Sequence, residues 1–94
     1  MRVVWSERAA DDVVQIVSFL AKSGLGEEAA ARIFEGVSGL AEFPELGMKV
    51  RIRPRGRRLI ISFRSWAYVL RYRLRPGEVF VERVLDSRRI RQKQ

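Results

Sequence analysis

The stretch RLIISFRSWAYVLRYRL, residues 58–74, decides the fold of this 94-residue chain. Its large apolar side chains recur at every second position on both sides of the dipeptide Ser65-Trp66. They are Leu59, Ile61 and Phe63 before that dipeptide and Tyr68, Leu70, Tyr72 and Leu74 after it. Because this alternation places one face of a strand against a core, the stretch predicts two antiparallel strands joined tightly at Ser65-Trp66. We therefore expect the rings of Tyr68 and Tyr72 in the core.

Two further strands extend this hairpin on either side. Downstream, Pro76-Gly77 is a turn signal, and the segment EVFVERVL at 78–85 is apolar at most positions. Upstream, the periodicity changes from helical to alternating after Gly47, and residues 54–56 form a further turn signal. The alternating residues there are Val50, Ile52 and Pro54 on one side and Arg51, Arg53 and Arg55 on the other. Four closely spaced strands of this kind predict an antiparallel meander.

The first half of the chain predicts a strand followed by two helices. Residues 1–5, MRVVW, are apolar and β-branched, and Ser6 stands at the N-cap position of the helix that follows. An apolar stripe at helical spacing then runs through Ala9, Val13, Ile16, Val17 and Leu20. A second helix is predicted from Leu25 or Gly26 to about Phe43, because Pro44 disfavours helical geometry in the residue before it.

These elements predict a single α+β domain over residues 1–94. We expect an N-terminal strand, an antiparallel two-helix hairpin packed on one face of a small antiparallel sheet (β-α-α-β-β-β-β), and a basic C-terminal tail. The tail, residues 86–94, is either a last helical turn or a disordered arm.

The composition excludes several kinds of chemistry. The chain has no cysteine and no histidine, so neither a disulfide, a thiolate metal site nor the usual nucleophile–base pair can form. An acid–base pair of carboxylates would have to come from Asp11, Asp12, Glu78, Glu82 or Asp86, and nothing in their spacing selects two of them. We therefore expect no metal, no cofactor, no membrane span and a reducing, cytoplasmic location. Catalysis, if present, would have to rely on arginine and tyrosine.

The charge of the chain is unevenly distributed. Residues 1–48 carry four basic and eight acidic side chains, whereas residues 49–94 carry fifteen basic and three acidic ones. Sixteen of the nineteen basic residues are arginines, whose guanidinium groups bind phosphates and carboxylates through two parallel hydrogen bonds. The asymmetry predicts a surface for a polyanion or an acidic protein, although a solvated surface would also explain it.

Alternation places the arginines in two rows on the predicted sheet. Arg51, Arg53 and Arg55 form one row, and Arg71, Arg73 and Arg75 form the other. If the helices cover the opposite side, the two rows share a solvent-exposed face, and their mutual repulsion favours an anionic partner. The alternative is a solvated sheet face. Most aromatic residues nearby are expected in the core, and Trp66 is the one expected to be exposed.

The element order and several short motifs resemble the RelE/ParE toxin superfamily of bacterial type II toxin–antitoxin systems, over the whole chain. The opening S-x-x-A-x-x-D-hydrophobic-x-x-I is represented by Ser6, Ala9, Asp12, Val13 and Ile16. The link L-x-x-x-P-x-x-G is represented by Leu40, Pro44 and Gly47, and basic residues follow it at Arg51 and Arg58. The runs VLRYRL at 69–74 and RVLDSRR at 83–89 resemble the family's later strands.

The resemblance implies one of two activities. RelE-like members are ribosome-dependent mRNA endonucleases, and here their metal-independent basic cluster would be Arg51, Arg53, Arg58, Arg71 and Arg73. Such members often use a C-terminal tyrosine or histidine, and this chain has neither after Tyr72. ParE-like members of the plasmid-stabilisation type poison DNA gyrase by binding it, without catalytic residues. The RVLDSRR segment and the missing base favour the ParE-like branch.

The resemblance also implies a cognate antitoxin with an acidic, partly disordered segment, and a hetero-oligomeric complex with it. A non-toxic relative that keeps only antitoxin binding is a third possibility. The residues expected to bind target or antitoxin are Arg51, Arg53, Arg55, Arg58, Trp66, Arg71, Arg73, Arg75, Arg88 and Arg89.

Overall fold

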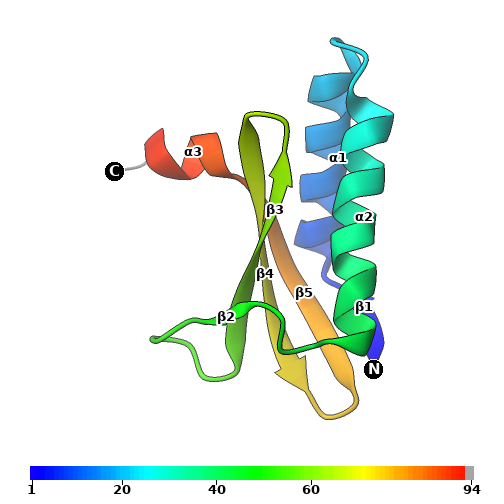
Figure 1. The fold of residues 1–94 in the computed structure, drawn as a ribbon. Helices are drawn as coiled ribbons and strands as arrows, with labels where there is room; N and C mark the ends of the chain where they lie inside the picture. Colours follow the sequence, from blue (N-terminus) through cyan, green and yellow to red (C-terminus); the bar gives the residue numbers. More distant parts are fainter. Residues whose placement is uncertain (93–94) are drawn as a thin grey trace.

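A computed structural model describes residues 1–92 of the chain, with the side chains of residues 1–89. The last two residues of the predicted tail, 93 and 94, lie outside the described part. The elements are β1 (Arg2–Trp5), α1 (Glu7–Ala21), α2 (Gly26–Glu42), β2 (Met48–Lys49), β3 (Gly56–Phe63), β4 (Trp66–Arg75), β5 (Glu78–Asp86) and α3 (Ser87–Gln92) (Figure 1). The predicted α+β element order is confirmed, and residues 87–92 of the tail are helical.

The five strands form one sheet in the order β1-β5-β4-β3-β2. Strands β2 to β5 are the predicted antiparallel meander. Strand β1 differs, because it pairs in parallel with β5, from Arg2 beside Glu78 to Trp5 beside Val81. A parallel neighbour needs a long crossover connection, and β1 is separated from β5 by both helices and three strands of the sheet.

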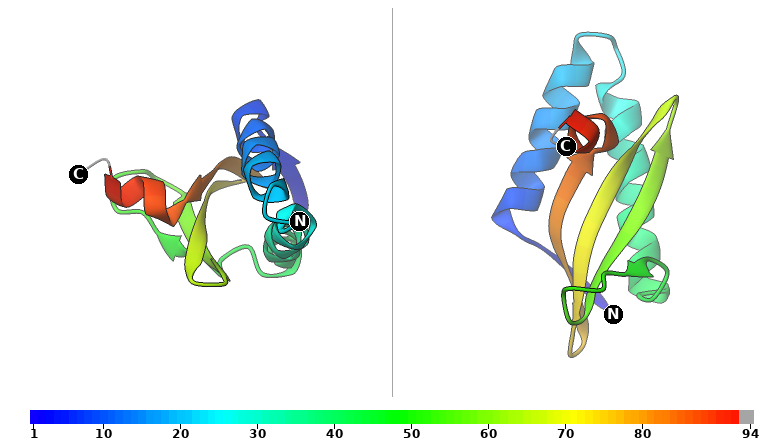
Figure 2. Two further views of the ribbon diagram at one scale, coloured as in Figure 1. Left: turned by 90° about the horizontal axis from the view of Figure 1, so that it is seen from above. Right: turned by 90° about the vertical axis from the view of Figure 1, so that its left-hand side faces the viewer.

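Helices α1 and α2 form a hairpin that covers one face of the sheet, and the other face has no helix laid along it (Figures 1 and 2). The predicted N-cap is present, since the Ser6 hydroxyl accepts a hydrogen bond from the Ala9 amide at 3.0 Å. The buried core lies between the helices and the sheet. It includes Ala9, Val13, Leu20, Ile33, Val37, Leu40, Ile61, Phe63, Leu70, Val79, Val81 and the predicted Tyr68 and Tyr72.

The strand predicted between Gly47 and the turn at residues 54–56 is present, but it ends before the alternating residues that begin at Val50. Only Met48 and Lys49 pair with β3, and the chain then turns back on itself. The Val50 amide donates to the Gly56 carbonyl at 2.9 Å, which closes the turn, and Arg55 has a positive φ of 63°. Pro54 has no amide hydrogen to give to a ladder, which disfavours the strand that alternation alone predicts.

The connection between β3 and β4 also lies one residue earlier than predicted. The two turn residues are Arg64 and Ser65, and Arg64 takes a positive φ of 52°. Trp66 is therefore the first residue of β4 and pairs with Phe63.

Tyr72 joins the end of the helical hairpin to the sheet through its hydroxyl group. The hydroxyl donates to the Pro44 carbonyl at 2.8 Å and accepts from the Gly47 amide at 2.9 Å. A Cβ at residue 47 would lie 2.7 Å from that hydroxyl, so this close approach requires the glycine. The contact fixes where the chain enters β2.

Replacing Tyr72 with phenylalanine should therefore lower the free energy of unfolding by about 1–3 kcal/mol, because the buried Gly47 amide loses its acceptor. Urea denaturation measures the change. The matched control is Tyr68→Phe, whose hydroxyl accepts only from the half-buried Trp66 indole and should cost less. Equal losses in the two variants would contradict a special role for the Tyr72 bridge.

Candidate functional site

The candidate site is the sheet face turned away from α1 and α2, which we call the outer face. Its arginines come from β3, from β4 and, in the case of Arg53, from the turn after β2. Alternate residues of the two strands, such as Leu59, Leu70 and Tyr72, pack on the core. Figure 2 shows this face with α3 projecting at one end and the segment around β2 projecting at the other. These two projections bound the outer face.

Arg58 and Arg71 lie directly opposite each other on β3 and β4. Neither guanidinium forms an ion pair with any described residue. The Nε atom of Arg71 is buried without an acceptor, as is that of Arg73. Like charges directly opposite in a sheet are destabilising. Two residues further along the same strands, Ile60 lies opposite Val69 on the same side of the sheet. The two arginines without an ion pair therefore lie next to a pair of apolar side chains.

Arg73 is already paired within the chain. Its guanidinium and that of Arg53 both donate to one oxygen, Oε2 of Glu82, and the Arg53 contact is 2.9 Å long. The Glu82 side chain is only 13% exposed, so water screens this cluster weakly. The contact also ties the turn at residues 50–55 to β5, 29 residues further along the chain.

A β-bulge directs Glu82 into this cluster. Arg71 is opposite Arg83 and Tyr72 is opposite Val81, so Glu82 is the extra residue of β5. The Ser6 hydroxyl donates to the Glu82 carbonyl at 2.9 Å and holds the bulge from the α1 side. The sequence shows Glu82 as an isolated acid in an apolar strand, but contains no signal for the bulge.

Arg83 is neutralised by the acidic half of the chain. Its guanidinium donates to both carboxylate oxygens of Asp12 on α1, at 2.8 and 3.0 Å, and the Val84 amide donates to the same side chain at 2.9 Å. Hydrogen bonding to Asp12 raises the pKa of Arg83. Arg83 therefore fastens α1 to β5 and adds no free charge to the outer face.

The remaining predicted arginines are dispersed, so the two predicted rows do not exist as a six-residue array. Arg75 lies 3.8 Å over the ring of Phe80 in a cation–π contact. Arg51 and Arg55 lie in the turn after β2, beside a hollow that Leu74 also lines. Of the two predicted rows, Arg71, Arg73 and Arg75 lie on β4, and Arg53 is brought beside Arg73 by their shared contact with Glu82.

Trp66 is half-buried, so the prediction that it is exposed is wrong. Its indole donates to the Tyr68 hydroxyl at 2.8 Å, and its ring meets Phe63 edge-on at 5.4 Å between centroids. Arg88 of α3 lies 4.0 Å over the same ring. Trp66 therefore holds α3 against the sheet through its contact with Arg88. The next residue, Arg89, is exposed at this end of the outer face.

Asp86 holds Arg88 in that position. Its carboxylate accepts two hydrogen bonds from the guanidinium, at 3.0 and 2.7 Å, and one from the Arg88 amide at 2.9 Å. Burial would raise the pKa of Asp86, but the hydrogen bonds and the charge of Arg88, helped by the charge of Arg89, lower it below the usual 3.8. The sequence did not assign a role to Asp86.

The two tyrosines of the chain cannot reach the outer face. Tyr68 and Tyr72 are both fully buried on the helix side, and their hydroxyls are hydrogen-bonded to the Trp66 indole and to the Pro44 carbonyl, respectively. Burial raises the pKa of Tyr68 and of Tyr72. Within residues 1–92, no group of three acidic side chains is placed to hold a metal ion, and no helix is long and apolar enough to span a membrane.

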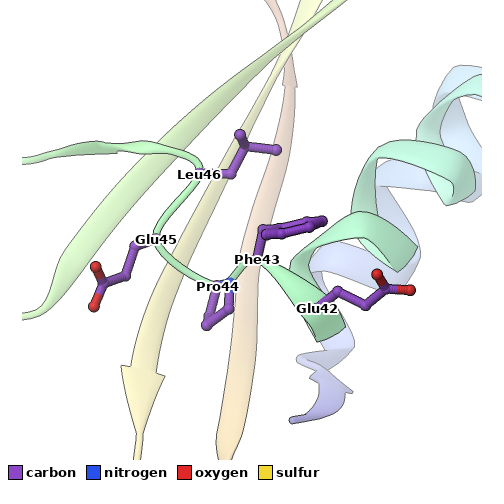
Figure 3. Close-up of a pocket in the computed structure, with 5 residues that line it drawn as sticks. All are labelled: Glu42, Phe43, Pro44, Glu45 and Leu46. Carbon is purple, nitrogen blue, oxygen red and sulfur yellow. The ribbon is translucent and has the colours of Figure 1, made fainter.

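A second surface feature lies where α2 ends. Residues 42–46 line a shallow hollow, and Phe43 and Leu46 point to one side of it while Glu45 points to the other (Figure 3). Phe43 and Leu46 are both exposed. This apolar patch was not predicted from the sequence, because Phe43 was read as the last residue of the helix.

The fold and the outer face define a small α+β protein that presents arginines on the sheet face opposite its helical hairpin. Comparison with known proteins identifies its family. The chain belongs to the ParE toxin family, described as the ParE toxin of the type II toxin–antitoxin system parDE, whose profile matches residues 3–91. This confirms the predicted resemblance and its ParE-like branch.

A solved structure supports the fold. The chain is similar to a protein of the chromosomal ParDE toxin–antitoxin system from P. aeruginosa, with a TM-score of 0.73 and 20% sequence identity. The match covers 92% of this chain and 95% of that one. Among curated proteins, no sequence matches the chain.

Protonation of Asp86 should release α3. The folded state lowers the pKa of the Asp86 carboxyl group, so the carboxylate stabilises the docked α3 fully at pH values above 3.8, the ordinary pKa of the group. This stabilisation is lost as the pH falls through the lowered pKa. In a Trp5→Phe background, Trp66 fluorescence should change in that acidic range, before the far-UV circular dichroism is lost. Adding Asp86→Asn should abolish the change, and a transition that persists in that variant would contradict the assignment.

Proposed function

We propose that this protein is the toxin of a type II toxin–antitoxin pair, that it acts by binding and poisoning DNA gyrase, and that an antitoxin with an acidic segment neutralises it. Membership of the ParE toxin family supports the toxin role. The choice between binding and catalysis rests on the chemistry of the outer face.

The burial of both tyrosines is the observation that carries the proposal. An RNA-cleaving site needs a group that accepts the proton of the attacking 2′-hydroxyl, next to groups that stabilise the developing charge. The arginines of the outer face supply only the second requirement, since a guanidinium hardly deprotonates. Tyr68 and Tyr72 lie on the opposite side of β4, and two guanidiniums already occupy Glu82.

The form of the outer face supports a protein partner. Charged and apolar side chains alternate on it, with Ile60 54% exposed beside Arg58. Among the described residues, β2 covers β3 only at Arg57 and Arg58, so the edge of β3 beyond them has no strand partner. An open edge offers backbone donors and acceptors that an extended segment of a second protein can pair with.

The antitoxin is proposed from the charge of the chain. The net charge of +8 and the unpaired guanidiniums of the outer face favour an acidic segment that folds on binding. Such a partner removes the repulsion between Arg58 and Arg71, and the two proteins form a hetero-oligomer.

Gyrase poisoning is tested with purified protein, DNA gyrase, plasmid DNA and ATP. At stoichiometric protein, we expect blocked supercoiling and trapped, cleaved plasmid. A reaction without gyrase controls for a contaminating nuclease. If gyrase is unaffected and mRNA is cut in the ribosomal A site instead, the RelE-like alternative replaces this proposal. If neither happens, the protein is a non-toxic antitoxin-binding relative.

The helix α3 should contribute to the target interaction, because it projects from the outer face with Arg88 and Arg89 exposed (Figure 1). Ending the chain after Ser87 removes it but keeps the hydrogen bond from the Ala67 amide to the Ser87 hydroxyl. We expect this variant to fold and to lose most of its effect on gyrase. Thermal unfolding checks the fold, and full gyrase inhibition by the folded variant would exclude α3 from the interface.

A further inference from the structure

The arginines of the outer face fall into two classes that differ in what they already bind. Arg53 and Arg73 share one carboxylate oxygen of Glu82. Arg58 and Arg71 have no carboxylate among the described residues, although they lie directly opposite each other. The two pairs carry the same formal charge, but only Arg53 and Arg73 are neutralised by another of the described residues.

We propose that the Arg58–Arg71 pair is the carboxylate-binding site of the outer face, and that Glu82 acts as a built-in anion that keeps Arg53 and Arg73 out of that site. The proposal rests on the proposed function for its partner, an acidic segment of the antitoxin. It specifies that Arg58 and Arg71 bind the partner's carboxylate and that Arg53 and Arg73 do not.

The two arginine pairs differ in what a partner's carboxylate must do to bind them. At Arg58 and Arg71 it forms a new ion pair, whereas at Arg53 and Arg73 it must replace an existing one. A carboxylate that reaches Arg58 and Arg71 relieves repulsion between opposed like charges and makes new charge-assisted hydrogen bonds. A carboxylate that reaches Arg53 and Arg73 must first displace Glu82, which would leave that acid buried without its partners. The first site therefore binds and the second does not.

The neighbouring side chains indicate the form of the segment. Ile60 and Val69 lie two residues along their strands from Arg58 and Arg71, a rise of about 6.6–6.8 Å. Residues four apart in an α-helix are separated by about 6 Å along its axis. A helix lying along β3 therefore sets an acidic residue over the arginine pair and an aliphatic residue, four positions away, over Ile60, which is exposed whereas its neighbour Val69 is buried.

This spacing favours a protein segment over a nucleic-acid backbone. A phosphodiester chain offers charge at each step and has no aliphatic group for Ile60, which is more than half exposed. The segment that fits is an amphipathic helix with glutamate and leucine at positions i and i+4.

The probe is a fluorescein-labelled helical peptide of about 14 residues with glutamate and leucine four apart, compared with a peptide in which glutamine replaces each glutamate. Anisotropy titrations at about 0.15 M salt keep long-range attraction small. We expect the full-length protein to bind the glutamate peptide at least about tenfold more tightly than the glutamine peptide. Equal binding of the two peptides would overturn the proposal.

Two charge-matched double variants separate the arginine pairs. Arg58→Ala with Arg71→Ala should weaken binding of the glutamate peptide by about tenfold or more. Arg53→Ala with Arg73→Ala removes the same formal charge and should change it by less than about threefold. Equal losses would show a general charge effect and overturn the assignment. Circular dichroism and thermal unfolding verify that both variants are folded.

Glu82→Gln tests the second half of the proposal. Removing the built-in anion frees Arg53 and Arg73, so the glutamate peptide should bind more tightly to this variant than to the unchanged protein. Unchanged or weaker binding would overturn the role of Glu82. The gyrase assay is independent of these titrations. Gyrase poisoning without a preference for the glutamate peptide would support the proposed function and overturn only this binding site. Glutamate-dependent binding without poisoning would support the binding site and overturn the proposed function.

Discussion

The crowding of guanidinium groups on a small sheet is the constraint on which the rest of this structure depends. The basic second half of the chain would repel itself if its charges stayed unpaired. The acidic helices relieve part of that repulsion, through Asp12 with Arg83 and Glu28 with Arg64. Within the sheet, Glu82 and Asp86 each hold guanidiniums of their own. The charge left over is concentrated on the outer face, where a partner can reach it.

One strand, β4, separates the buried tyrosines from the arginines of the outer face. Its residues Tyr68, Leu70 and Tyr72 face the helices and are fully buried, whereas Arg71 and Arg73 face the other way. Since successive side chains of a strand point to opposite faces, the thickness of the sheet lies between the phenolic groups and the guanidiniums. Tyr72 organises the link into β2 through two hydrogen bonds and is not available for proton transfer at the arginines.

The sequence predicted most of the fold, and its errors have physical causes. The alternation in residues 58–74 was reliable because it runs through many consecutive positions, with a buried face behind it. The alternation in residues 50–55 has the same appearance, but Pro54 and the turn closed by Gly56 prevent a strand there. Trp66 was expected to be exposed because it lies near a turn, yet Phe63, Tyr68 and Arg88 surround its ring.

The sequence by itself determined the order of the elements, the helical hairpin, the two faces of β4 and the excess of positive charge, because all of these depend on residues close together in the chain. Only the tertiary structure decided which arginines are free. Arg83 is paired across 71 residues, and Arg53 across 29. The bulge that aims Glu82 and the parallel pairing of β1 depend on the same kind of distant contact. Local patterns carry no information about such contacts, so the distinction between a neutralised and an available guanidinium appears only in the folded chain.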